Sequence, residues 1–233
     1  MILFICVSAC VTVDIRPSVV ELLPRDANDE LQLVISPTID PTTMATTRLG
    51  AVGGREVFSS RERNAGSTRT VLFERAGRSS ALWPLLEVGF EDGLFNDGSA
   101  ELIATPDRTF LVIRVDVPGT GNFNADVVLH WNGRGWVEVD AAKWLADFEL
   151  PRCYEIWKGA RADLEAFRGR SAVWVEGDAN CCPSGGEVTA TLELRDRAIR
   201  VRSQEPKLVP LETLRKGPER AEALKACEAG TKP

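Results

Sequence analysis

Short runs of β-branched and aromatic residues, each bounded by turn-forming residues, follow one another from residue 70 to residue 203. Val, Ile, Thr and the aromatic residues pack well on a pleated sheet, whereas Gly, Pro, Asn and Asp favour the turns between strands. The sequence therefore predicts a mainly β fold of antiparallel meanders, arranged as a sandwich, a roll or propeller-like units, with short helices and a helical C-terminal tail. The predicted strands in this part cover residues 70–74, 101–104, 109–117, 125–131, 135–140, 154–157, 171–175, 187–195 and 198–203.

Two stretches, residues 110–140 and 171–203, share one order of elements: strand, loop, strand, tight turn, strand. They are either a duplicated β unit or two ordinary meanders. In the first stretch the tight turn is Asn-Gly at residues 132–133, a strong hairpin signal because both residue types tolerate positive φ. A two-residue turn there would place Leu129 opposite Trp136. A short helix is expected after it, at residues 141–148.

The composition divides the chain into four parts. Residues 37–70 are rich in Thr, Gly, Arg and Ser and show little periodicity, which is typical of a linker or a long loop. The tail is helix-prone but interrupted at Gly217-Pro218. The predicted division is a signal peptide at residues 1–9, an N-terminal tether or poorly structured region at 10–69, a β-rich domain at 70–205 and a helical tail at 206–233.

The N-terminus has the outline of a secretory signal. An apolar run at residues 1–9 ends in small residues, as the hydrophobic part of an export signal does. The four residues Val-Ser-Ala-Cys at positions 7–10 resemble a bacterial lipobox, in which the peptidase cuts before the cysteine and the thiol is acylated. This resemblance implies lipidation of Cys10; the alternative is a buried N-terminal strand over residues 2–15.

The remaining cysteines fit an exported protein. Loss of residues 1–9 removes Cys6, and acylation would use Cys10. Four cysteines then remain, an even number that suits two disulfides in an oxidising compartment such as the periplasm or the cell surface. The disulfide candidates are Cys153, Cys181, Cys182 and Cys227.

Cys181 and Cys182 are adjacent, in a loop of turn-forming residues at 176–186. Zinc ligands are normally separated by at least two residues, and thioredoxin-like dithiols use Cys-x-x-Cys at the start of a helix. A structural role is therefore favoured. Three pairings are open: a bond between the two neighbours would leave Cys153 and Cys227 to join each other, and we favour this pairing slightly. In the other two, each loop cysteine bonds to one of those partners.

The same loop carries a resemblance to known proteins. Asp-Ala-Asn-Cys-Cys-Pro-Ser-Gly-Gly at residues 178–186, Trp-Asn-Gly at 131–133 and Ile-Trp-Lys-Gly at 156–159 resemble segments of a group of exported bacterial proteins of unknown function. The resemblance spans residues 110–201. It implies a small exported β-rich domain and brings no activity with it.

Charge and residue content limit the function. The net charge of −6 argues against nucleic-acid binding, which needs a basic surface. The single histidine, His130, and the dispersed acids give no recognisable catalytic group, metal site or cofactor site. The sequence therefore predicts an extracytoplasmic lipoprotein that acts as a binding or envelope-structural module. The alternative is a thiol-redox protein or a hydrolytic enzyme.

The expected binding surface lies on loops. The glycine-rich loops at residues 118–124 and 178–186 take equivalent places in the two meanders, and loops on a rigid scaffold commonly carry binding residues. We expect Asp178 and Asn180 to make polar contacts to an envelope protein or a glycan. Contact with a membrane is expected only through the lipid anchor.

Overall fold

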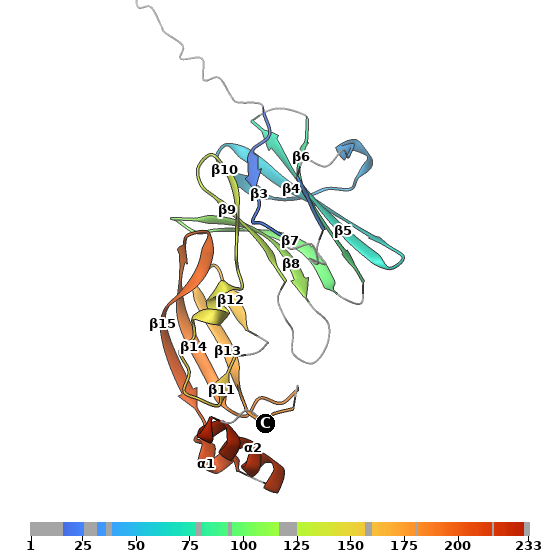
Figure 1. The fold of residues 1–233 in the computed structure, drawn as a ribbon. Coiled ribbons are helices and arrows are strands. Elements are labelled where there is room, and N and C mark those ends of the chain that lie inside the picture. Colours follow the sequence, from blue (N-terminus) through green and yellow to red (C-terminus); the bar gives the residue numbers. More distant parts are fainter. Residues whose placement is uncertain are drawn as a thin grey trace, which may run out of the picture.

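The computed structural model describes residues 16–25, 32–35, 39–77, 81–92, 95–116, 125–156, 160–179, 181–215 and 217–230. The described chain is mainly β, with antiparallel meanders and short helices, as the sequence predicts. Its strands form three five-stranded sheets, which we call sheets I, II and III. Sheet II lies between sheet I, above it in the view of Figure 1, and sheet III, below it.

Sheet I is an antiparallel sheet with the strand order β2-β6-β5-β4-β3. The strands β3, β4, β5 and β6 follow one another in the chain and form a meander. The short β2 pairs with the free side of β6. The strands are β2 (Gln32–Ile35), β3 (Thr47–Val52), β4 (Arg55–Asn64), β5 (Ser67–Ala76) and β6 (Trp83–Glu91).

Residues 39–69 differ from the expectation of a poorly structured region, because they form β3, β4, the start of β5 and the short 3₁₀ helix η1 (Pro41–Thr43). The glycines at 53 and 54 form the turn of a hairpin, both with positive φ. The polar side chains face outward and pair across strands, as Glu56 does with Arg75 and Glu62 with Arg69. A half-exposed sheet needs such polar positions, so their abundance does not indicate a linker.

Sheet II has the order β1-β10-β9-β8-β7. Four of its strands form an antiparallel meander, and β1 from the N-terminal segment adds in parallel to β10. The strands are β1 (Val19–Glu21), β7 (Asn96–Ala104), β8 (Thr109–Asp116), β9 (Val127–Trp131) and β10 (Gly135–Val139).

The turn between β9 and β10 lies one residue later than predicted. Trp136 lies opposite Trp131, whereas the predicted partner of Trp136 was Leu129. The reason is the side chain of Asn132, which accepts hydrogen bonds from the backbone N–H groups of Arg134 and Gly135, both at 2.9 Å. This Asx turn makes Asn132 the residue that closes the hairpin instead of a central turn residue.

Both faces of sheet II are covered, and each face belongs to a separate hydrophobic core. Alternate residues of β8 point to opposite sides, so Leu111, Ile113 and Val115 pack toward sheet I while Phe110 and Val112 pack toward sheet III. All five are at most 1% exposed. The continuous apolar run of β8 is what a strand buried on both faces requires.

Sheet III repeats the meander of sheet II, with the order β11-β13-β14-β15 and with β12 also paired to β13. The predicted helix at residues 141–148 is shorter and of 3₁₀ type, η2 (Lys143–Asp147), and it places Trp144 over Gly169. A side chain at position 169 would collide with this indole, whose ring would lie 2.4 Å from an added Cβ. The strands are β11 (Tyr154–Glu155), β12 (Arg161–Asp163), β13 (Arg168–Val175), β14 (Gly186–Arg195) and β15 (Ala198–Leu208).

The C-terminal tail is helical and broken at Gly217-Pro218, as predicted, although β15 extends to Leu208 before it begins. Two helices follow, α1 (Leu211–Leu214) and α2 (Pro218–Ala229), at the lower end of the molecule in Figure 1. Leu224 of α2 is fully buried.

Residues 16–25 form a strap along the edge of the two upper sheets, whereas the sequence suggested a tether. The hydroxyl of Ser18 donates to the carboxylate of Glu74 on β5 at 2.7 Å, and the N–H of Leu23 donates to Glu138 on β10 at 2.8 Å. The side chains of Glu74 and Glu138 are only 1% and 5% exposed. Buried carboxylates need hydrogen-bond donors. The strap supplies them, including its own Arg25 for Glu138, and Arg55 of β4 is a further partner of Glu74.

Candidate functional site

The loop between β13 and β14 is organised by the carboxylate of Asp178. It accepts hydrogen bonds from the backbone N–H of Val175 at 2.8 Å, and from the N–H and hydroxyl of Ser184 at 2.9 and 2.8 Å. A fourth bond comes from the guanidinium of Arg220 on α2 at 2.6 Å. The Asp178 side chain is 1% exposed. Its oxygens are therefore used inside the protein, and Asp178 is a structural residue where we had expected a polar contact to a partner.

Arg220 joins this loop to the C-terminal helix. Its guanidinium also donates to the hydroxyl of Ser184, and its side chain is 26% exposed. The backbone of Gly177, with φ of 84°, passes close to Ala223 of the same helix. Sequence reasoning missed Arg220, because the turn residues indicate a loop but nothing local identifies a partner 42 residues away.

Asn180 and Cys10 lie outside the described residues, as does the glycine-rich loop at 118–124. The expected pairing of the two loops as one binding surface therefore stays a prediction. The part of the second loop that the structure describes, residues 176–179 and 181–185, packs on α2 through Asp178 and Arg220.

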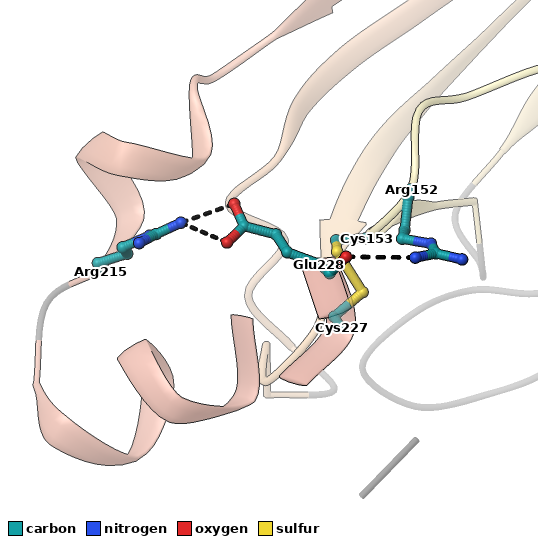
Figure 2. Close-up of a disulfide and its surroundings, with 5 residues drawn as sticks. All are labelled: Arg152, Cys153, Arg215, Cys227 and Glu228. Atoms are coloured by element: carbon teal, nitrogen blue, oxygen red, sulfur yellow. Dashed lines mark hydrogen bonds and ion pairs between the residues drawn. A yellow bond between two sulfur atoms is a disulfide. The ribbon is translucent and has the colours of Figure 1, made fainter. Parts of the chain in front are cut away.

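The structure pairs the four disulfide candidates as we slightly favoured. Cys181 is bonded to Cys182, with Cα atoms 3.8 Å apart, and both residues are exposed. Cys153, just before β11, is bonded to Cys227 of α2 across 74 residues, with Cα atoms 5.8 Å apart (Figure 2). The disulfide between Cys153 and Cys227 attaches the tail to sheet III at a second point, in addition to the contact that Arg220 makes.

Polar contacts surround the long disulfide. Arg152 donates to the backbone carbonyl of Glu228 at 3.2 Å, and both carboxylate oxygens of Glu228 pair with Arg215 at 2.6 and 2.5 Å (Figure 2). Arg215 and Glu228 are each 41% exposed, so this ion pair contributes little to stability. The disulfide, the buried Leu224 and the bond from Arg220 to the buried Asp178 therefore account for most of the attachment of α2.

His130 lies on β9, the middle strand of sheet II, on the face that is turned toward sheet III. Its ring packs against Phe110 at 5.3 Å between centroids, as a structural histidine does. Partial burial, and then the positive charge of Arg108, lower the pKa of His130. At neutral pH its imidazole is therefore uncharged.

The described residues contain no group of three His, Cys, Asp or Glu side chains that could hold a metal ion. Within the same residues no helix has both the length and the apolar character needed to cross a membrane. No protein-family model matches the chain, and comparison with curated proteins and with solved structures gives no significant match.

We predict that Asp178→Ala lowers the free energy of unfolding by about 3 kcal/mol, because it leaves Arg220 and two backbone N–H groups without their acceptor. Denaturant unfolding followed by fluorescence measures the change. Glu176→Ala is the matched control: it removes the same charge from an exposed position of the same loop, and its effect should stay within about 0.5 kcal/mol. Equal stability of the two variants would contradict the structural role of Asp178.

We predict that replacing both Cys153 and Cys227 by Ser lowers the free energy of unfolding by about 4 kcal/mol, since the bond closes a long loop. The same replacement at Cys181 and Cys182 should cost only about 1 kcal/mol, because that ring contains two residues. Peptide mapping without reduction tests the pairing first. A peptide that joins Cys153 to either loop cysteine would show the pairing to be wrong.

Proposed function

We propose that this protein is an extracytoplasmic lipoprotein, anchored in a membrane by acyl chains on Cys10, that serves as a binding or envelope-structural module without catalytic activity. The observation that carries the proposal is the disulfide between Cys153 and Cys227. Bonds of this kind persist in oxidising compartments such as the periplasm or the cell surface, and are rare in the cytosol. The expected partner is an envelope protein or a glycan.

The position of the strap supports an anchored protein. Arg16 follows Cys10 by six residues, which span about 20 Å at most when fully extended. From Ser18 onward the chain is bonded to sheet I through Glu74. An anchor at Cys10 would hold the two upper sheets close to the bilayer, with little freedom to move away.

The opposite end of the molecule would then face away from the membrane. In Figure 1 the strap lies in the upper part of the molecule, while α1 and α2 lie at its lower end. The loop with Cys181 and Cys182 lies against α2 through Asp178 and Arg220. This lower end, held by the long disulfide, is the surface that we propose to present to a partner.

The export proposal predicts that the chain, expressed from its own gene in its own cells, incorporates a palmitate analogue and partitions into the detergent phase. Cys10→Ala should abolish both, because two acyl chains are what hold such a protein firmly in a membrane. Cys6→Ala is the matched control, since that cysteine lies in the leader to be removed, and it should leave the labelling unchanged. Unlabelled, water-soluble protein that retains Met1 would contradict the proposal.

A further inference from the structure

A groove of about 340 Å³ lies where sheet II meets the hairpin of β14 and β15. Two leucines, Leu192 and Leu194, and the imidazole of His130 are part of its lining. Junctions between packed units are common positions for small-ligand sites, and this volume falls in the usual range for them. The other lining residues are Asp107, Arg108, Glu193 and Arg202.

The four charged residues of this groove are not all paired with one another. Arg108 is held by Asp107 at 2.9 Å, and its guanidinium lies 4.0 Å from the centre of the Phe167 ring. Glu193 is countered by Arg195 at 3.3 Å, which lies outside the groove. Both acids are therefore already paired.

Two polar groups of the groove remain available. Within the described part of the chain, neither the exposed Arg202 nor the imidazole of His130 has a hydrogen-bond or ion-pair partner. The His130 ring is held in place from behind by Phe110. A free guanidinium and a free imidazole thus line the groove together with two leucines.

A neighbouring groove shares His130 and Leu194, but its arginine is already engaged in hydrogen bonds. Its arginine, Arg197, already donates to the backbone carbonyls of Glu138 and Glu21, at 3.2 and 2.9 Å. That guanidinium is therefore committed to holding the strap to sheet III.

We propose that the groove over Leu192 and Leu194 binds a carboxylate that carries a short branched apolar group, with Arg202 and His130 as its polar contacts. A guanidinium matches the planar geometry of a carboxylate and can donate two parallel hydrogen bonds to it. Leu192 and Leu194 in the lining favour an aliphatic body over an inorganic anion such as phosphate. This site is independent of export and lies away from the loop on α2.

The magnetic resonances of the His130 ring can report binding, because His130 is the only histidine in the chain. A bound anion opposes the lowering of the His130 pKa by burial and by Arg108, so binding should raise that pKa. By linkage, affinity then increases as the pH falls through the pKa of the bound form, and levels off below that of the free form. The charged residues that face His130 from the two grooves are Glu21, Asp107, Arg108, Glu193, Arg197 and Arg202.

The experiment follows the carbon and proton resonances of the His130 ring in the purified full chain while a ligand is added at several pH values. Isovalerate represents a free acid, and acetyl-Ala-Leu represents the C-terminus of a protein. The amides of both compounds have the same shape without the charge. We expect saturable shifts with the acids, a raised pKa of His130, and tighter binding at pH 5.5 than at pH 8.

Arg202→Gln should weaken binding of the acids about tenfold, the effect of losing one charge-assisted contact. Arg63→Gln is the matched control: it removes the same charge from an exposed residue of sheet I, and the affinity should not change. Tighter binding of the peptide than of isovalerate would identify a protein C-terminus as the source of the carboxylate. Unchanged His130 resonances, equal shifts with the amides, or an unaffected Arg202→Gln variant would each overturn the proposal.

Discussion

Burial of sheet II on both faces is the constraint on which the rest of the structure depends. Leu129 and Trp136, both fully buried, complete the core toward sheet I. Phe110 and Val128 complete the core toward sheet III, where Phe110 meets Phe167 at 5.8 Å. Neither outer sheet has a complete core without the middle one. The two proposed surfaces, the groove beside His130 and the loop on α2, are both built on sheet III and so depend on this arrangement.

The buried carboxylates impose a second constraint. Glu74 and Glu138 sit inside the upper sheets, where an ion without donors would be costly. The strap at residues 16–25 supplies backbone N–H groups and a guanidinium to them. This explains why a segment with little periodicity of its own is ordered, and it gives the chain a firm attachment close to the cysteine that we propose to be acylated.

Local sequence signals predicted the parts of the fold that depend on local chemistry. The apolar run of β8, the turn residues around 176–186 and the break at Gly217-Pro218 were sufficient to predict a strand, a loop and a divided tail. The strands β3 and β4 were missed because their polar residues face outward and pair across strands, which composition alone does not distinguish from a linker. The strap was missed because its partners lie 56 and 115 residues away.

The candidate sites likewise combine features that the local sequence predicts with features that depend on distant residues. Four cysteines allow three pairings, and the sequence favoured only slightly the one that the structure shows. The role of Asp178 could not be predicted, because its environment is created by Arg220 on a distant helix. The groove beside His130 depends on the packing of sheet II on β14 and β15, a contact between segments about 60 residues apart that has no signal in either one.

The most direct test of the shared middle layer is native-state hydrogen exchange on the full chain with Phe110→Ala. If sheet II couples the two cores, this loss of a buried ring should lower the opening free energy of amides in β5 and in β14 alike, by about 3 kcal/mol or more. A decrease confined to β14, with the amides of β5 unchanged, would show that sheet III unfolds independently and would contradict the account.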